Sequence, residues 1–305
     1  KDFADYLGGG YADGVNSGTN AVYVALRSLD LEPYSEVIVP PISDPGGVMQ
    51  VALMQCIPVT ADSAPGSYNT SAEQIAVCLT KRTRAIIVAH ISGIPVDMDP
   101  VLELAKGRGI PVIEDCAQAH GATYKGRIVG SLGDVSAFST MFGKHHATGG
   151  QGGVVFTPSQ SRYWRVRQVA DRGKPFGLEG EHTNVAAALN CNMDELHAAI
   201  GCVQLRRLPE ILARRRKLAR LVDQGLKEKI KTIRLVTGPA NSESAYWFFF
   251  LHIQLDRITV SLETFAKAVT EEGVPLSFGY SNLPSTQEWF RNRAVFGTSG
   301  LPWSN

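Results

Sequence analysis

This sequence has few cysteines, no long hydrophobic run and a net charge near zero, and each of these features argues against a class of protein. The five cysteines are scattered and never form a CxxC pair, so we expect neither a structural zinc site nor a disulfide framework, but reduced thiols in a cytoplasmic protein. No apolar run reaches the roughly 18 to 20 residues of a membrane span. The formal net charge is only +1, which gives no overall attraction to nucleic acid or to an anionic membrane.

The length and composition indicate a globular protein with more than one core. The 305 residues are too many for a single small core, and 44% hydrophobic with 19% charged residues is ordinary for such a protein. We expect a large domain over residues 1–205, followed by a long connecting helix and a small C-terminal domain over residues 206–305. Both chain ends read as incomplete, because the chain starts close to a loop pattern that enters a core helix and stops in the loop residues GLPWSN.

Strand and helix patterns alternate through the first of these domains. Short apolar runs predict strands at residues 36–40, 57–60, 85–89, 111–114, 135–139 and 153–157. Helical patterns fall at residues 48–54, 70–80 and 100–106, and a helix start at residues 16–19. Continuous apolar strands separated by amphipathic helices favour an α/β fold with a mostly parallel central sheet and helices on both faces.

The composition changes after about residue 205. Residues 206–230 form one long helical pattern with an apolar stripe, and beyond them come strand patterns at residues 245–255, a helix at 262–272 and a strand near Val274. These patterns predict a smaller α+β domain. The basic run at residues 214–217 lies on the long helix, and with the near-zero net charge we interpret it as a solvated or interface face instead of a nucleic-acid site.

Residues 112–156 carry the chemistry. An apolar run ends at Asp115, Ser139 ends a later strand, and Lys144 stands just before a cluster of glycines. A lysine can form a Schiff base with the aldehyde of pyridoxal phosphate (PLP), and an acid can pair with the pyridinium nitrogen, so this order of residues suits that cofactor. We expect the pKa of Lys144 to be depressed in a partly buried turn beside His145 and His146. The alternative from local sequence is a surface lysine in a loop.

Other polar residues have a functional and a structural interpretation each. Ser17, Gly18 and Thr19 open a helix after a tight loop, which suits a phosphate, although from local sequence alone we favour Ser17 or Thr19 as a simple N-cap. Gln118 and His120 follow Asp115, and either side chain is suited to hydrogen-bond a cofactor oxygen. Either is also explained as a polar residue of the core whose hydrogen bonds are satisfied within the protein, and for His120 we favour this second interpretation. We expect no metal at the pair of histidines after Lys144, because no third ligand has suitable spacing.

Taken together, these residues resemble the sugar aminotransferase family of fold-type I PLP enzymes, also called the DegT/StrS family. The similarity starts at GVNSGTNAVYVAL, continues through EVIVPP and RTRAIIVAHISGIPVDMDPVLELAKGRGIPVIEDCAQAHGATYKGR, and includes FSTMFGKHHATGGQGGVVF. It ends with LNCNMDELHAAIGCVQLRRLPEILARRR. Members of the family move an amino group, usually from glutamate, to a keto sugar carried on a nucleotide, and a few act on cyclitols.

The resemblance implies a role for each matching position. Lys144 would be the internal aldimine lysine and the proton shuttle, Asp115 would keep the pyridine nitrogen protonated, and Gln118 would lie near the phenolic oxygen or ring of the cofactor. Its phosphate would be bound by Gly18, Thr19 and Ser139, and by Asn190 of the neighbouring subunit in a homodimer with shared active sites. Gly126, Arg127 and residues 247–250 are candidates for the acceptor pocket.

Three departures from the family pattern leave alternatives open. The family usually has a ring-stacking aromatic residue after the second strand, where this chain has Ser43, Asp44 and Pro45. Gln151 replaces the acid of the usual GEGG motif, and Asn192 replaces an arginine that usually follows the Asn190 position. Counting from Ser139 puts Lys144 at the aldimine position, whereas counting back from the last glycine pair puts His145 there. With His145 as base the chain would be a PLP-dependent sugar dehydratase. The missing aromatic residue and the altered GEGG motivate a further alternative, a non-catalytic binding or regulatory protein on the same scaffold.

Overall fold

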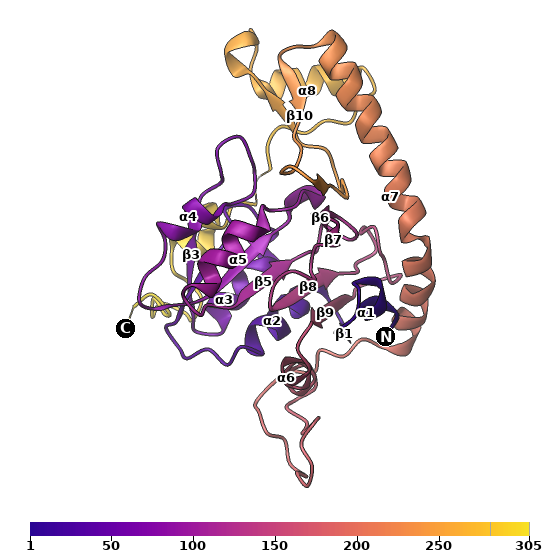
Figure 1. Cartoon of the computed structure of the whole chain (residues 1–305). Coiled ribbons are helices and arrows are strands. Elements are labelled where there is room, and N and C mark those ends of the chain that lie inside the picture. Colours follow the sequence, from indigo (N-terminus) through magenta and orange to yellow (C-terminus); the bar gives the residue numbers. More distant parts are fainter. Residues whose placement is uncertain (281, 305) are drawn as a thin grey trace.

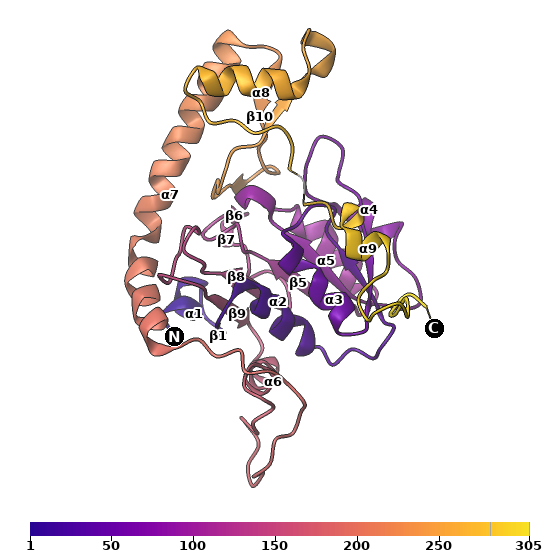
Figure 2. The ribbon, with the colours of Figure 1, turned by 180° about the vertical axis from the view of Figure 1, so that it is seen from behind.

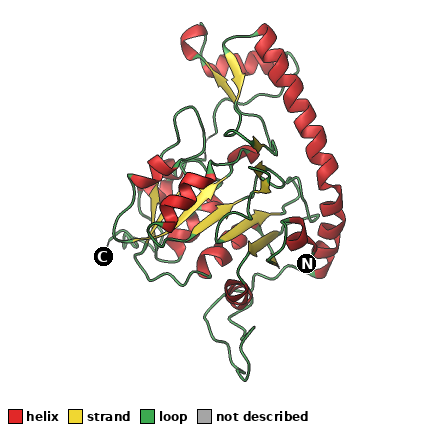
Figure 3. Cartoon of the chain, in the orientation of Figure 1, coloured by secondary structure: helices red, strands yellow, loops and turns green. Residues whose placement is uncertain are grey.

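A computed structural model describes residues 1–280 and 282–304. At its centre is a seven-stranded sheet in the order β1-β9-β8-β5-β4-β2-β3 (Figure 1, Figure 3). The strands are β1 (Tyr11–Val15), β2 (Glu36–Val39), β3 (Ile57–Thr60), β4 (Thr83–Ala89), β5 (Val112–Asp115), β8 (Val135–Ser139) and β9 (Gly153–Thr157). Only β9 runs against its neighbours β8 and β1, and the other pairs are parallel. The predicted α/β fold with a mostly parallel sheet is confirmed.

Helices cover both faces of this sheet, as the sequence predicted. On one face α2 (Gly18–Arg27), α3 (Met49–Leu53) and α6 (Gln160–Ala170) pack against the strands and form one buried apolar cluster. On the other face α1 (Asp2–Tyr6), α4 (Ala72–Ala76), α5 (Met98–Lys106) and the middle of α7 form a second cluster. Two apolar layers therefore hold the strands, whose carboxyl ends carry the residues described below.

The helix α7 (Glu195–Lys229) is 35 residues long and leads from the sheet to a second lobe (Figure 1, Figure 2). It begins before residue 206, where the sequence pattern placed its start. Asp194 caps it by accepting a hydrogen bond from the His197 N–H at 2.9 Å. Its first turns carry Leu196, Ile200 and Val203 at helical spacing, but these apolar side chains are exposed. The domain division at residue 205 stays a prediction, and α7 runs through it.

The second lobe combines a short antiparallel pair with a helix. The strands are β10 (Ile233–Leu235) and β12 (Leu251–Ile253), and the helix is α8 (Leu262–Glu271). The strand predicted over residues 245–255 is wrong for residues 245–250, which return to the large body, where the Ala245 N–H donates to the Gly93 carbonyl at 2.9 Å. In the described part of residues 270–281 there is no strand near Val274.

The last residues fold back onto the large body beside α3 and α4 (Figure 2). Trp289 of α9 (Glu288–Arg291) packs against the apolar cluster on the α2 face. A three-stranded sheet, β11 (Ser242–Glu243), β6 (Thr123–Tyr124) and β7 (Arg127–Ile128), also joins the two lobes. Short 3-10 turns complete the chain at η1 (Pro45–Gly47), η2 (Ile91–Gly93), η3 (Leu255–Arg257) and η4 (Pro284–Thr286).

Several elements differ from the sequence-based expectation. The helix predicted at residues 70–80 is only five residues long, and β1 and α6 were not predicted. β1 has the sequence YADGV, with little strand propensity of its own, and forms through its full antiparallel pairing with β9. Among the described residues we find no helix that combines the length and apolar character of a membrane span.

Candidate active site

The candidate site lies at the carboxyl ends of the parallel strands, around Asp115. This residue ends β5 and is buried, with its Oδ1 accepting a hydrogen bond from the Ala117 N–H at 3.0 Å. Burial raises the pKa of the Asp115 carboxyl, the bond from Ala117 and the nearby Lys144 oppose that rise, and Asp44 adds to it. A buried carboxylate of this kind is stabilised by a positively charged N–H donor.

Lys144 follows β8 in a turn closed by its own N–H, which donates to the Met141 carbonyl at 2.9 Å. Burial lowers the pKa of the Lys144 amine, while Asp115 and Asp44 raise it. The depressed pKa agrees with the prediction, although burial, and not the neighbouring histidines, is its main cause. The structure thus places Lys144 and Asp115, two of the predicted site residues, close enough that the charge of each shifts the pKa of the other.

The start of α2 meets the end of β8 beside these residues. Ser17 is the N-cap, and its Oγ accepts from the Asn20 N–H at 3.0 Å, so the capping interpretation holds for its side chain. Gly18 lies so close to Ser139 that an added Cβ would collide with the Ser139 Cβ. An added Cβ on Gly46 would likewise collide with the Thr19 Oγ1. The positive end of the α2 dipole and two hydroxyls therefore converge where an anion would be favoured.

A small pocket opens between the ends of β2, β4 and β5. Its lining residues are Ser43, Asp44, Ala89, His90, Ile91, Asp115, Ala117 and Gln118. Gln118 is buried, accepts from the Ser92 N–H at 2.6 Å through Oε1, and donates to the Tyr280 hydroxyl at 3.4 Å through Nε2. Ser43 and Asp44 line this pocket, and among its described lining residues none is a phenylalanine, tyrosine or tryptophan.

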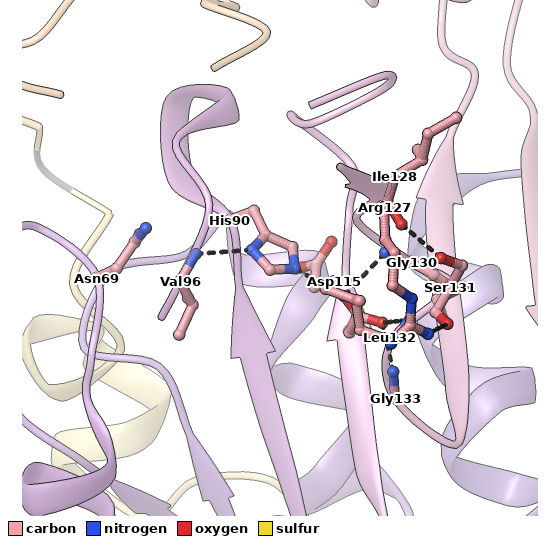
Figure 4. Close-up of polar contacts among 12 residues, drawn as sticks. Asn69, His90, Val96, Asp115, Arg127, Ile128, Gly130, Ser131, Leu132 and Gly133 are labelled. Carbon is pink, nitrogen blue, oxygen red and sulfur yellow. Dashed lines mark hydrogen bonds and ion pairs between the residues drawn. The ribbon is translucent and has the colours of Figure 1, made fainter. Parts of the chain in front are cut away.

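Sequence reasoning did not find the role of His90, which lines this pocket. Its Nδ1 accepts from the Val96 N–H at 3.0 Å, and its Nε2 lies 3.0 Å from Glu114 Oε2 (Figure 4). No local motif marked this residue: Val96 follows it in the same loop after β4, and Glu114 lies 24 residues away on the neighbouring strand β5.

The histidines after Lys144 turn away from that chemistry. His145 Nε2 lies 3.1 Å from the Ala245 carbonyl oxygen, and His146 Nε2 lies 2.9 Å from the Gly201 carbonyl oxygen. Burial, with Arg215 nearby, lowers the pKa of His145 to about 4. Neither Asp115 nor Asp44 is among the main causes of this shift in the pKa of His145. The geometry therefore favours Lys144 over His145 as the residue that faces the pocket acids.

His120 does not have the satisfied hydrogen bonds that we expected. It is buried, its ring lies within 6.1 Å of the His145 and His146 rings, and within the described chain neither of its ring nitrogens has a partner. Burial, with His146 and His145 next, lowers its pKa well below the ordinary value, so the ring is uncharged at neutral pH.

Two further groups of predicted residues lie elsewhere. Asn190 is exposed, bridges to Asp171, and accepts from Asn192 Nδ2 at 2.9 Å, so it does not line the pocket of its own chain. In the basic run of α7, Arg215 donates to the Tyr246 and Trp247 carbonyls at 2.9 and 3.1 Å. This contact ties one residue of the basic run to residues 246 and 247 of the same chain, and the interpretation of the run as a solvated or interface face stays a prediction. Arg127 donates to the Ser131 carbonyl at 2.7 Å in the β7 turn.

The sequence profile of the DegT/DnrJ/EryC1/StrS aminotransferase family matches residues 1–304. The chain is 37% identical over 226 residues to a GDP-perosamine synthase of Caulobacter vibrioides, covering 74% of this chain and 60% of that protein. It is 32% identical to an L-glutamine:scyllo-inosose aminotransferase of Streptomyces griseus, covering 96% of this chain and 73% of the relative. The match therefore spans three fifths of the length of the perosamine synthase.

A solved structure supports the same assignment. The X-ray structure of the aminotransferase from Psychrobacter cryohalolentis superimposes with a TM-score of 0.90 at 32% identity, covering 96% of this chain and 79% of that one. The chain belongs to the DegT/DnrJ/EryC1/StrS aminotransferase family.

Proposed function

We propose that this member of the DegT/DnrJ/EryC1/StrS family is a PLP-dependent aminotransferase that moves an amino group from an amino acid to the keto group of a nucleotide-linked sugar or a similar polyol. The observation that carries the proposal is the convergence of Lys144 with Asp115 at the strand ends, beside the start of α2. The names of the relatives, a GDP-perosamine synthase and a scyllo-inosose aminotransferase, support the two acceptor classes.

The residues present fit the cofactor on three points. Burial raises the pKa of Asp115, so a pyridinium N–H is the kind of partner that this carboxylate needs. Gly18 packs against Ser139 with no room for a side chain, which places the first N–H groups of α2 beside the Ser139 hydroxyl, and these donors suit a phosphate group. Burial lowers the pKa of Lys144, which increases its neutral, nucleophilic fraction. When bound, PLP supplies an electron sink for the substrate carbon.

The roles of the protein side chains follow from this fit. Lys144 would hold the cofactor and move a proton at its Nζ between the donor carbon and the cofactor. Asp115 would keep the pyridine nitrogen protonated, and Gly18, Thr19 and Ser139 would bind the phosphate. Gln118, whose carboxamide is oriented by the Ser92 N–H, would contact the phenolic oxygen or the ring. Glutamate is the expected donor, and glutamine is the alternative that the name of the Streptomyces griseus relative suggests.

The proposal includes a homodimer with shared sites in the cytoplasm. Exposed apolar side chains gather on the turn before Lys144 and around the start of α7, among them Phe142, Leu189 and Leu196. Ile200 of α7 packs over Gly149 in the glycine turn after Lys144. A second copy that covered this surface would bring its Asn190 toward the neighbouring phosphate site. The five cysteines are all free, which suits a reducing compartment.

The experiment that tests the function is amino transfer itself. The full chain with PLP is mixed with an amino donor and with a nucleotide-linked 4-keto sugar or scyllo-inosose. The donor is glutamate labelled with nitrogen-15 at its α-amino group, or glutamine labelled at either its α-amino or its amide nitrogen. The label is expected in the acceptor product, and one acceptor class is expected to dominate. Absence of label from every acceptor, with the cofactor bound, would contradict the transfer.

A further inference from the structure

The ammonium group of Lys144 rests on an aromatic ring from another part of the chain. Its Nζ lies 3.7 Å from the centroid of the Trp247 ring. The indole Nε1 of Trp247 donates to the Gly143 carbonyl at 3.0 Å, so the ring is attached to the same turn that carries the lysine. This distance is well within the range of about 6 Å over which a cation is attracted to an aromatic face.

Hydrogen bonds to the backbone of Trp247 hold it in this position. Its N–H donates to the Ser92 carbonyl at 2.8 Å, and Arg215 of α7 donates to its carbonyl oxygen at 3.1 Å. Ser92 has a φ of 60°, a left-handed conformation that serine rarely adopts. Its Oγ also donates to the Phe248 carbonyl, and its N–H donates to Gln118. The strained residue therefore ties the Trp247 segment to a side chain of the pocket.

We propose that Trp247 is a positioning residue that holds the Lys144 amine over the site whenever that amine is not bonded to the cofactor. This inference rests on the proposed function, in which the lysine is released by the amino donor and then carries a proton. A free lysine side chain has several rotatable bonds, so without a contact its amine would move away from the donor carbon at which it transfers the proton. The indole face offers it one place to stay, and it favours the protonated form that the lysine reaches after accepting the proton.

Once the cofactor is bound, the Trp247 ring and Asp44 are the groups around Lys144 that can still stabilise its ammonium. Asp115 and Asp44 act on the amine from the strand ends, and Asp115 is engaged by the pyridinium when the cofactor is present. The buried rings of His120 and His145 are uncharged near neutral pH and provide no anion. The Trp247 face is then a stabilising group for the ammonium that cofactor binding does not occupy.

The test measures Lys144 in the full chain without cofactor, so it does not depend on transfer activity. Trace acetylation with isotope-coded acetic anhydride over a range of pH, read by peptide mass mapping, gives the apparent pKa of each lysine. We expect the pKa of Lys144 to fall by about one half to one pH unit in Trp247→Leu, in line with the usual strength of a cation–π contact. In Trp247→Phe, which keeps an aromatic face, the fall should be smaller.

Trp164→Leu is the matched control, since Trp164 is a partly exposed tryptophan on α6, and it should leave Lys144 unchanged. A pKa of Lys144 that is the same in wild type and Trp247→Leu would overturn the inference. If Trp247→Leu does not fold, Trp247→Met, which also lacks an aromatic face, decides in its place, and an unchanged pKa of Lys144 in that variant contradicts the contact. Failure of the wild type to transfer nitrogen would count against the proposed function only, because acetylation still reports on Trp247.

Discussion

His90 Nε2 donates a hydrogen bond to Glu114 Oε2 across 3.0 Å, and solvent reaches neither side chain. The direction of the bond follows from the Val96 N–H, which donates to Nδ1 and leaves the proton on Nε2. Glu114 also accepts from the N–H groups of Gly130, Leu132 and Gly133 at 2.6 to 2.8 Å (Figure 4). This glutamate immediately precedes Asp115, so four donors fix the strand end that carries the candidate acid.

Glu114→Gln is expected to destabilise the protein. Burial alone raises the pKa of Glu114, but the bonds from His90, Gly133 and Gly130 outweigh it and hold the pKa below its ordinary value of 4.5. An amide replaces an acceptor by a donor that faces other donors, and we expect a loss of about 2 to 4 kcal/mol in the free energy of unfolding by urea. The loss should shrink below about pH 4.5, where the unfolded carboxyl is protonated. Glu103→Gln on the exposed side of α5 is the control, and equal losses in both variants would contradict the account.

His145→Gln is expected to make the protein less sensitive to acid. The folded pKa of His145 is about 4, against 6.5 when unfolded, so the unfolded state binds a proton first as the pH falls. This single residue should remove stability between pH 6.5 and 4, by at most about 3 kcal/mol at 1.36 kcal/mol per pH unit. The free energy of unfolding, followed across that range, should fall less steeply in His145→Gln than in the wild type. His182→Gln in an exposed loop should behave as wild type, and an equal slope in His145→Gln would show that the buried ring does not matter.

Gly18→Ala is expected to weaken the binding of PLP and of inorganic phosphate by roughly 10-fold or more. The added Cβ would collide with Ser139, so the start of α2 has to move away from the end of β8. Titration of absorbance or fluorescence gives the two affinities. Gly225→Ala is the matched control, because Gly225 lies within α7 with open space around it and should gain about 0.5 to 1 kcal/mol of stability. Unchanged affinity in Gly18→Ala would place the phosphate elsewhere.

Asp115→Asn is expected to raise stability and lower activity. Burial raises the pKa of Asp115, so its charge costs stability once the pH rises through the folded pKa, and removing that charge should stabilise the cofactor-free protein at neutral pH by about 1 kcal/mol. The amide cannot keep the pyridine nitrogen protonated, and kcat should fall by roughly 100-fold or more. Asp256→Asn, at an exposed position in η3, should change neither quantity. A cofactor-free Asp115→Asn protein that is less stable than wild type would contradict the burial argument.

Much of the large domain could be predicted from the sequence, because its parallel strands are continuous apolar runs that end near the residues of the site. The strands at residues 57–60, 135–139 and 153–157 have the predicted bounds, and the approach of Lys144 to Asp115 follows from parallel strands ending at one edge. The elements that were missed depend on distant partners. β1 forms by pairing with β9, and the first turns of α7 are mostly exposed.

The contacts of Trp247 show the limit of local pattern most clearly. Residues 245–250 are apolar and aromatic, and this composition favours a strand. In the folded chain they are drawn out of strand pairing by hydrogen bonds to Ser92 and Gly93 and from Arg215. The Trp247 side chain meets the Lys144 turn across 104 residues of sequence, a separation at which no motif spacing is informative.

The most direct test of the central claim is borohydride reduction of the full chain with bound PLP, followed by peptide mass mapping. We predict one permanent cofactor adduct, on Lys144, with the visible absorbance of the bound aldehyde lost on reduction. His145→Gln should give the same adduct, and Lys144→Ala should give none. A cofactor that binds but cannot be reduced onto any lysine would contradict the account and favour His145-dependent dehydration, and a chain that binds no cofactor would favour a non-catalytic role.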